Sequence, residues 1–406
     1  MIVPAPARLG PGESLGDEGY RLEVRDGRTR IEAETDAGRF YAERTLQRLP
    51  EGDVAIADRP RFAWRGFMLD VARHFFGVAD VCRAIDHLAA YKLNVLHLHL
   101  SDDQGWRLAI DAWPRLAERG GAGAVGNAPG GFYTHDDLRA IVRYAAERFV
   151  TVVPEIDAPS HTQAAIASYP ELGVPGSSRD LYAGTEVGFS SLDVHSALTY
   201  RFLDDVFGEL AALTPGPFLH VGGDEAHSTS RADYLAFMAR VQPLVAKHGK
   251  RLVGWEEVAS APLAGGAVVQ HWTDPALARA AAEQGAQLVM SPADRVYLDM
   301  KYDPDTPLGL DWAGHVELRD SYDWDPAEIA GEEAVLGVEA PLWTETITAL
   351  EQLETMMLPR LCAVAEVAWS PQAERGWDDF RARVAAEGER WDAEGVAYHR
   401  SPQVDW

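Results

Sequence analysis

Short runs of consecutive apolar residues recur along this chain, bounded by Gly, Pro, Asp and Ser. Within a run the apolar side chains do not alternate with polar ones, which is typical of parallel strands buried on both faces. Eight runs have this pattern, at residues 64–71, 93–100, 150–156, 217–222, 251–255, 267–272, 286–291 and 334–343.

Segments with helical periodicity lie between most of these runs, at residues 78–91, 134–149, 196–213, 230–248, 275–285 and 350–369. One begins at Thr134 and has Asp137 three positions later, which indicates a capping box. Eight strands joined mainly by crossover helices predict an α/β fold, a (β/α)8 TIM barrel. A doubly wound open sheet is the alternative.

The first 60 residues lie outside the repeating pattern. Residues 31–35 have the composition of a strand, and residues 37–49 the periodicity of a helix. We therefore expect a short N-terminal α/β segment over 1–60 and a barrel domain over 61–406, with the boundary near Asp58-Arg-Pro60.

The net charge of the chain disfavours some classes of binding partner. The 406 residues include 37 Lys+Arg and 63 Asp+Glu, a formal net charge of −26, while hydrophobic residues make up 47%. The apolar fraction is that of a globular protein rather than a disordered one. The negative charge argues against nucleic acid and against an anionic membrane surface.

The sequence gives only weak indications of the cellular compartment. The start, Met-Ile-Val-Pro-Ala-Pro-Ala-Arg, lacks the basic and apolar regions of a secretory signal. Only Cys82 and Cys362 are present, so no disulfide framework is expected and both are predicted to be buried thiols. These features favour a reducing compartment and a cytoplasmic location.

Polar residues follow nearly every predicted strand. Buried charges are costly unless they are paired, and the carboxyl ends of barrel strands are where active sites lie. A ring of such residues therefore predicts a polar site, with a structural ion-pair network as the alternative. The ring consists of Asp70, Arg73, His74, Asp102, Asp103, Glu155, Asp157, His161, Asp224, Glu225, Asp299 and Glu345.

Asp224 and Glu225 are the sharpest feature of this ring. They follow Gly222-Gly223, which allows a tight turn. If both carboxyls face one site, one pKa is expected to rise, as a general acid at neutral pH requires. Alone, an Asp-Glu pair is more often a solvated turn or a helix cap.

Four aromatic residues also fall at predicted strand ends: Trp255, Trp272, Tyr297 and Trp343. Each alone would more often be core. Together with carboxylates, indole rings stacked on a sugar face would form a carbohydrate site, so the residues themselves indicate a carbohydrate-cleaving barrel.

Two other patterns suggest different chemistry. Gly121-Ala-Gly-Ala-Val-Gly126 has dinucleotide-binding spacing, but it neither follows a strand nor opens a helix, so we interpret it as a loop. His97 and His99 would point to the same side of a strand and, with His161, His220 or His271, could bind a catalytic metal. A metal-dependent barrel hydrolase is therefore an alternative.

Five motifs resemble glycoside hydrolase family 20, the β-N-acetylhexosaminidases, in order over about residues 60–370. They are Arg65-Gly-Phe-Met-Leu-Asp-Val-Ala-Arg-His74, His97-Leu-His-Leu-Ser-Asp-Asp-Gln-Gly-Trp106, Pro154-Glu-Ile-Asp-Ala-Pro-Ser-His161, His220-Val-Gly-Gly-Asp-Glu225 and Gly337-Val-Glu-Ala-Pro-Leu-Trp-Thr-Glu345. The resemblance implies a barrel and removal of terminal GlcNAc or GalNAc from an oligosaccharide, without cofactor or metal.

The resemblance also implies a role for each site residue. Glu225 would be the general acid and base, Asp224 and Tyr297 would hold the substrate's acetamido group, and Asp102 and His161 would support Glu225. Arg73 and Glu345 would bind the 3- and 4-hydroxyls and Asp299 the 6-hydroxyl. The pocket walls would be Trp255, Trp272, Trp312 and Trp343.

The expected mechanism is substrate-assisted, because this family is an exception to the two-carboxylate rule. A protein nucleophile requires carboxyls about 5–5.5 Å apart on opposite sides of the bond. Adjacent residues, with α-carbons about 3.8 Å apart, are poorly placed for this. A catalytically silent sugar-binding protein is a further alternative.

The chain departs from the family pattern in two places. Ser160 stands where the family usually has Gly, a change expected to touch no chemical group. The N-terminal segment is about half the usual length, so either that domain is reduced or the start has been lost.

Overall fold

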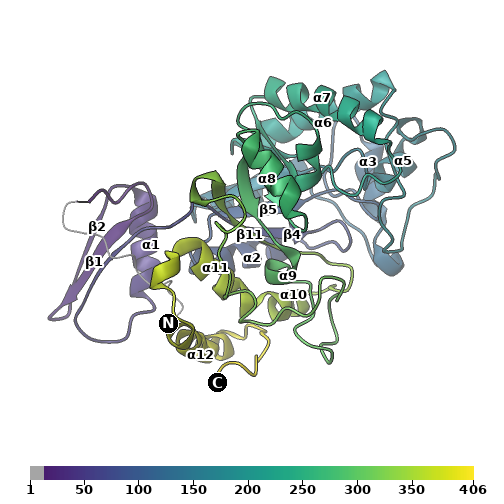
Figure 1. The fold of residues 1–406 in the computed structure, drawn as a ribbon. Helices are drawn as coiled ribbons and strands as arrows, with labels where there is room; N and C mark the ends of the chain where they lie inside the picture. Colours follow the sequence, from purple (N-terminus) through teal and green to yellow (C-terminus); the bar gives the residue numbers. More distant parts are fainter. Residues whose placement is uncertain (1–12) are drawn as a thin grey trace.

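The computed structural model describes residues 13–406, and the eight predicted strands close into a parallel barrel (Figure 1). The order around the barrel is β10-β11-β4-β5-β6-β7-β8-β9, which follows the chain. The predicted (β/α)8 fold is confirmed, and the open sheet is wrong. The strands are β4 (Trp64–Asp70), β5 (Val95–His99), β6 (Thr151–Glu155), β7 (Phe218–His220), β8 (Arg251–Trp255), β9 (Val268–His271), β10 (Gln287–Met290) and β11 (Val335–Leu342).

Helices surround the barrel, and five of the six predicted helical segments form single helices. The predicted capping box is present: Thr134 Oγ1 accepts from Asp137 N at 3.1 Å, and Asp137 Oδ2 accepts from Thr134 N at 2.9 Å. The helices are α2 (Val78–Ala90), α3 (Arg115–Glu118), α4 (His135–Ala146), α5 (Gln163–Ser168), α6 (Ala197–Leu213), α7 (Arg231–Lys247), α8 (Pro275–Glu283), α9 (Ala293–Val296), α10 (Leu350–Met357), α11 (Arg360–Trp369) and α12 (Trp377–Glu394).

The single helix predicted over 350–369 is wrong, because the structure has α10 and α11 there. Pro359 separates them and lies at the N-cap of α11. Proline has no backbone N–H to donate and its ring clashes with the preceding turn, so it begins a new helix instead of continuing the old one. Helix α12 was not predicted at all.

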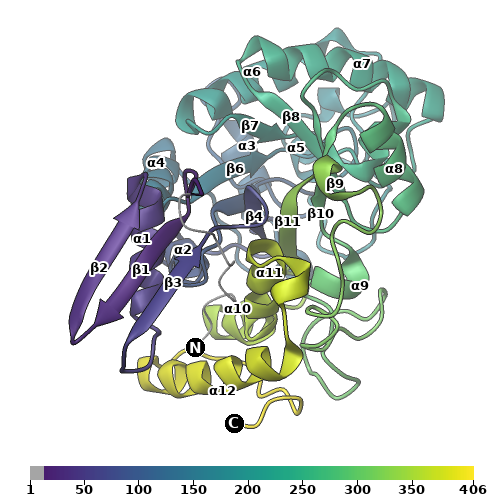
Figure 2. The same ribbon diagram turned by 60° about the vertical axis from the view of Figure 1, so that its left-hand side comes forward.

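The N-terminal part is a small antiparallel sheet with one helix, in the order β2-β1-β3 (Figure 2). Its elements are β1 (Tyr20–Arg25), β2 (Arg28–Ala33), α1 (Asp36–Leu46) and β3 (Val54–Asp58). The strand predicted over 31–35 overlaps β2, and the predicted helix ends three residues earlier than expected. Strands β1 and β3 were missed: the apolar positions of β1 alternate with charged ones, and β3 is a short run of five residues, two of them alanine.

Buried ion pairs join this sheet to the barrel. Arg65 on β4 lies 2.8 Å from Glu18, and the Lys92 ammonium lies 3.2 Å from the Asp58 carboxylate. Burial lowers the pKa of Lys92 to about 8, although Asp58 opposes this. Trp369 from α11 also packs among the core residues of the small sheet.

The barrel interior changes from apolar to polar along its axis. Strand residues two apart point to the same side, so Val95 lies below His97, Val153 below Glu155 and Val253 below Trp255. The lower residues form an apolar cluster with Val268 and Val289. The upper residues are buried and polar or aromatic, and they form the floor of the site described below.

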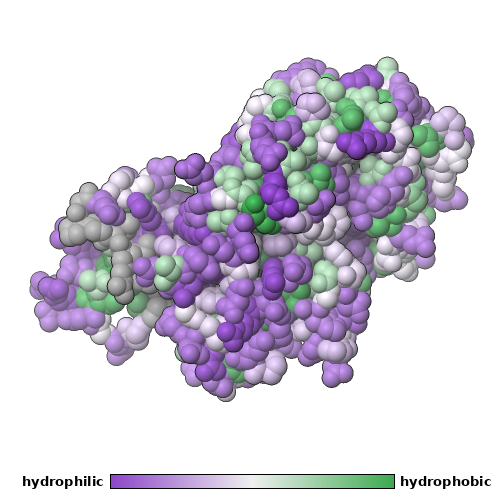
Figure 3. Space-filling model, viewed as in Figure 1, coloured by the Kyte–Doolittle hydropathy of each residue, from purple (hydrophilic) through white to green (hydrophobic). Residues whose placement is uncertain are grey.

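The surface is mixed, and in the view of Figure 3 it is mostly hydrophilic with scattered apolar patches. Among residues 13–406, no helix combines the length and the hydropathy needed to span a bilayer. Cys362 is buried, Cys82 is only partly so, and both are free thiols. The predicted absence of a signal at Met1–Arg8 concerns residues outside those described.

Candidate active site

A pocket of about 350 Å³ opens at the carboxyl ends of the barrel strands. Ligand pockets commonly range from about 300 to 1,000 Å³, so it is sized for a small group such as one sugar ring. Eleven of the twelve predicted site residues line it, and the exception is Asp102. The eleven are Arg73, His161, Asp224, Glu225, Trp255, Trp272, Tyr297, Asp299, Trp312, Trp343 and Glu345.

The turn after β7 presents the two adjacent carboxylates. Gly222 and Gly223 have φ angles of +66° and +97°, and Glu225 has +47°. A Cβ on Gly222 would lie 1.8 Å from the Asp157 carboxylate, whose Oδ1 also accepts from Gly223 N at 3.1 Å. Glycine is therefore required at residue 222 by backbone angle and by space.

Asp224 and Glu225 converge on one imidazole. His161 Nε2 lies 3.5 Å from Asp224 Oδ2 and 3.4 Å from Glu225 Oε2. On its other side, His161 Nδ1 lies 3.2 Å from Asp102 Oδ1. Asp102 thus lies behind His161, which explains why it does not line the pocket.

The same geometry separates Asp102 from its neighbour Asp103. Asp103 lies 3.9 Å from His161 Nδ1 and accepts instead from Gln163 N at 2.9 Å and from the Ser190 hydroxyl. Asp102 is therefore the carboxylate that contacts His161 through a hydrogen bond.

Burial and neighbouring charges shift the ionisation of this group. Burial raises the pKa of Asp224, and the Glu225 carboxylate adds to the rise while His161 opposes it. Burial opposes the charged form of His161, but Asp102 and Asp224 raise its pKa well above the ordinary value. Despite burial, Arg73 and His161 hold the pKa of Asp102 well below its usual range. The expected rise of one carboxyl pKa thus falls on Asp224.

Arg73 joins Asp102 to the Trp343 wall of the pocket. Its guanidinium lies 2.8 Å from Asp102 Oδ2 and 4.7 Å from the centre of the Trp343 ring. Burial raises the pKa of Asp299, and nearby Glu345 raises it further. Burial also raises the pKa of Glu345, although Arg73 opposes that shift.

Aromatic rings form the walls of the pocket. Trp255 and Tyr297 are buried, whereas Trp312 at the rim is 50% exposed. The Trp255 and Trp343 rings lie 5.8 Å apart, and Trp312 lies 5.9 Å from Trp272. Four further lining residues were not predicted, since they lie in loops without a motif: Thr185, Val187, Thr273 and Leu310.

Two carboxylates behind these walls were also missed. Glu256 accepts from the backbone N–H groups of Trp272 and Thr273, each at 3.0 Å. Glu257 accepts from the Trp272 indole at 3.2 Å. Their position directly after the Trp255 strand end was the available signal, and both fix Trp272.

The His97-x-His99 pair does point to one side of β5, as predicted. Both rings contact Glu155, and His97 Nδ1 also lies 2.9 Å from Glu339 Oε1. These carboxylates outweigh burial and raise the pKa of His97 to about 9 and that of His99 well above its ordinary value. Protonated imidazoles have no lone pair for a metal, so this geometry favours an ion-pair cluster.

Ser160 was expected to touch no chemical group, and this is wrong. Its hydroxyl donates to the backbone carbonyl of Asp224. The serine therefore fastens the His161 loop to the turn that carries the two carboxylates. By contrast, the Gly121–Gly126 loop forms 3-10 turns and opens no α-helix, as predicted.

Comparison with known proteins agrees with this geometry. Residues 62–372 match the sequence model of the glycosyl hydrolase family 20 catalytic domain, and residues 3–59 match that of domain 2 of the same family. A β-N-acetylhexosaminidase from Cellulomonas fimi is 48% identical over 421 residues, which cover 100% of this chain and 85% of that protein.

Solved structures give the same result. An N-acetyl-β-hexosaminidase from Streptomyces plicatus, in complex with thio-NAglucal, has a TM-score of 0.94 and 54% identity, covering 98% of this chain and 85% of the other. The family 20 β-N-acetylhexosaminidase from Streptomyces coelicolor A3(2) has a TM-score of 0.94 and 55% identity, covering 98% and 86%.

Proposed function

The chain belongs to glycosyl hydrolase family 20 and is a glycoside hydrolase with β-N-acetylhexosaminidase activity, and from this premise we propose an exo-acting, retaining, substrate-assisted mechanism. The substrate is an oligosaccharide with a terminal, non-reducing GlcNAc or GalNAc. Related proteins have been solved with thio-NAglucal and, in a mutant, with the product GlcNAc. A pocket of about 350 Å³ with buried walls accepts one terminal sugar.

The observation that carries the mechanism is the convergence of two adjacent carboxylates on one nitrogen. Asp224 and Glu225 both lie within 3.5 Å of His161 Nε2. A pair on the same side of the pocket is poorly placed to supply an acid on one face of the sugar and a nucleophile on the other. The substrate's acetamido oxygen then serves as the nucleophile.

Asp224 is suited to hold that acetamido group. Its Oδ1 is buried and has no hydrogen-bond partner among residues 13–406, so it is free to accept the acetamido N–H. Charge develops on the group as its carbonyl oxygen attacks the anomeric carbon. A positive charge stabilises ionised Asp224, and the Tyr297 hydroxyl donates to the carbonyl oxygen.

Glu225 transfers the protons. Its side chain is 24% exposed at the pocket, twice the 12% of Asp224. In the first step the glycosidic bond breaks and Glu225 donates a proton to the leaving oxygen, while the acetamido oxygen bonds to the anomeric carbon. In the second, water attacks that carbon, the oxazolinium ring opens, and Glu225 takes the water's proton. Two inversions retain the configuration.

The remaining lining residues bind the sugar. Arg73 and Glu345 hold the 3- and 4-hydroxyls, and Asp299 holds the 6-hydroxyl. The rings of Trp255, Trp272 and Trp343 enclose the acetamido methyl and the sugar, and Trp312 lies at the entrance. His161 and Asp102 support Glu225 from behind.

The experiment that tests this function is turnover of aryl N-acetylglucosaminides and N-acetylgalactosaminides. We expect the wild type to be active, and Glu225→Gln to lose about 10²–10⁴-fold or more in kcat, because the amide cannot donate or take the proton. Glu333→Gln, an exposed matched control, should be unaffected. Full activity of Glu225→Gln would contradict the assignment.

Two further measurements separate the alternatives. A thiazoline analogue of the oxazolinium intermediate should inhibit the wild type competitively. Activity lost to EDTA and restored by zinc would instead indicate a metal-dependent hydrolase. Binding of GlcNAc without any turnover would indicate a catalytically silent sugar-binding protein.

A further inference from the structure

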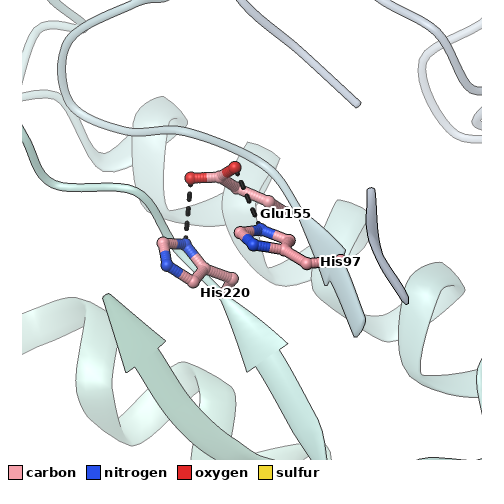
Figure 4. A group of neighbouring side chains, drawn as sticks. All are labelled: His97, Glu155 and His220. Carbon is pink, nitrogen blue, oxygen red and sulfur yellow. Dashed lines mark ion pairs between the residues drawn. The ribbon is translucent and has the colours of Figure 1, made fainter. Parts of the chain in front are cut away.

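A buried carboxylate, Glu155, lies in the barrel interior beneath the pocket. It is the last residue of β6 and is fully buried. The apolar layer of the barrel lies below it, and the pocket lies above. Figure 4 shows Glu155 between the His97 and His220 rings, which come from strands on either side of β6.

Both oxygens of Glu155 are occupied. Oε1 lies 2.9 Å from Trp255 Nε1 and 2.9 Å from His220 Nδ1. Oε2 lies 3.1 Å from His97 Nε2 and is hydrogen-bonded to His99 Nδ1. One side chain therefore gathers partners from three other strands, β5, β7 and β8.

One of these contacts continues to the acid and base. His99 Nε2 lies 2.7 Å from Asp102 Oδ2, and Asp102 Oδ1 lies 3.2 Å from His161 Nδ1. His161 Nε2 then lies 3.4 Å from Glu225 Oε2. A continuous row of polar groups thus runs from the barrel interior to the carboxyl that transfers the proton.

A second contact holds the pocket wall. The Trp255 indole N–H donates to Glu155, which fixes the rotation of the ring within the barrel. The same ring lies 5.8 Å from the neighbouring ring of Trp343, which also lines the pocket. The wall and the polar row therefore share one anchor.

The Glu155 carboxylate and the His97 and His99 imidazoles stabilise one another's charged forms. Burial opposes ionisation of Glu155, but His99, His220 and His97 together hold its pKa well below the usual range. An ionised carboxylate accepts several charge-assisted hydrogen bonds, whereas an amide oxygen in its place accepts fewer and weaker ones. The anchor therefore requires a carboxylate and not only a polar group of that size.

We propose that Glu155 is a positioning residue for the reaction, which fixes the Trp255 wall and the His99–Asp102–His161 row behind Glu225 from one carboxylate. The proposal rests on the function proposed above. Without this anchor His99 loses its fixed orientation, Asp102 shifts, and Glu225 becomes a poorer proton donor.

The test measures how the effect of Glu155→Gln on kcat/KM depends on the leaving group of the substrate. A phenyl glycoside needs protonation of its leaving oxygen, whereas a dinitrophenyl glycoside departs with little help. We expect kcat/KM to fall at least about tenfold more for the phenyl substrate than for the dinitrophenyl one. This difference is part of the rate enhancement of about 10²–10⁴-fold that general acid catalysis supplies. A loss of packing alone would slow both substrates equally. Binding of the thiazoline analogue should also weaken, because the Trp255 wall is released.

Glu339→Gln is the matched control. Glu339 on β11 is also fully buried, and it accepts from His97 Nδ1, Trp64 Nε1 and Gln270 Nε2 at 2.8–2.9 Å. No hydrogen bond or ion pair joins it to Trp255, His99 or Asp102 among the described residues. Its substitution is expected to lower stability but to leave the phenyl-to-dinitrophenyl ratio at the wild-type value.

The outcomes separate cleanly. An unchanged ratio in Glu155→Gln, or an equal change in Glu339→Gln, overturns the proposal. If circular dichroism shows that Glu155→Gln does not fold, His99→Gln takes its place, since it cuts the row between Glu155 and Asp102, and an unchanged ratio there has the same meaning. Absence of wild-type turnover would contradict the proposed function instead.

Discussion

At the scale of single residues, the pocket contains several acids whose charged form is disfavoured by burial and by one another. Burial raises the pKa of Asp224, Asp299 and Glu345, and nearby carboxylates add to each rise. A positive charge on the substrate relieves all of these interactions at once. Under the proposed mechanism these residues would stabilise the cationic intermediate more than the neutral substrate, which is the requirement for catalysis.

Glu257, behind the Trp272 wall, is another buried carboxyl with a raised pKa, and it gives a prediction about stability and pH. Burial raises its pKa from 4.5 to about 8, and Asp224 adds to the rise. Below pH 4.5 the carboxyl is protonated whether the chain is folded or not. As pH rises towards 8 the unfolded chain releases this proton while the folded protein retains it, so the folded state loses stability. Glu257→Gln should therefore unfold at a higher temperature than the wild type, by a margin that grows between about pH 5 and about pH 8.

The control for this prediction is Glu333→Gln, at an exposed position. It should change the unfolding temperature little at either pH. In Glu257→Gln the amide oxygen of the new side chain can still accept from the Trp272 indole, so the wall contact is retained. A Glu257→Gln margin that shrinks as pH rises would show that the carboxyl is not held in its neutral form.

The sequence located the pocket residues well because strand ends in a barrel converge. It identified ten of the lining residues by their position after apolar runs, and Trp312 through the family resemblance. It could not show the role of Glu155, although it placed this residue at a strand end, because the partners of Glu155 come from three other strands. Periodicity tells which side a residue faces, and not which side chain meets it across the barrel.

At the scale of elements, the turn after β7 sets the geometry of catalysis. Gly222 needs a positive φ, and its missing Cβ leaves room for Asp157. Ser160 fastens the neighbouring loop to the same turn. The sequence predicted the turn from its glycines, but it could not predict the Ser160 contact, because that depends on how two loops meet.

Gly222→Ala tests this turn. A methyl group 1.8 Å from the Asp157 carboxylate forces the turn to move, and a displacement of about 1 Å costs about 10²-fold in rate. We expect kcat/KM for an aryl N-acetylglucosaminide to fall by about that factor. Gly265→Ala is the matched control, since nothing lies within 4 Å of the added methyl, and it should keep wild-type activity. Near wild-type activity of Gly222→Ala would mean that the turn is not rigid.

At the scale of the whole molecule, the barrel and the small sheet are joined by buried charges. The Arg65–Glu18 and Lys92–Asp58 pairs cross between them, and α12 reaches the same region through Glu387, which lies 3.2 Å from Arg48. We propose that residues 1–60 and 61–406 are two domains held together by these contacts. The repeating pattern of strands and helices was enough to predict the barrel. Strands β1 and β3 and the charged helix α12 were missed because their stability comes from packing against the rest of the molecule.

The net charge of −26 is also a property of the whole molecule. Most acids lie on a hydrophilic surface, and only a few define the reaction. Of those few, Asp224 and Glu225 converge on one nitrogen of His161 and so lie on the same side of the pocket, where they are poorly placed to act from opposite faces of the sugar. We therefore propose that the substrate's own acetamido oxygen attacks the anomeric carbon.

The most direct measurement of that claim uses the wild-type protein and a series of aryl glucosaminides. The acetyl group is replaced in turn by fluoroacetyl, difluoroacetyl and trifluoroacetyl groups. Each fluorine withdraws electrons from the carbonyl oxygen and makes it a weaker nucleophile. If the acetamido oxygen is the nucleophile, kcat/KM falls steeply and progressively along the series. Equal rates for all four substrates would show that a group on the protein attacks instead, and would exclude a substrate-assisted mechanism.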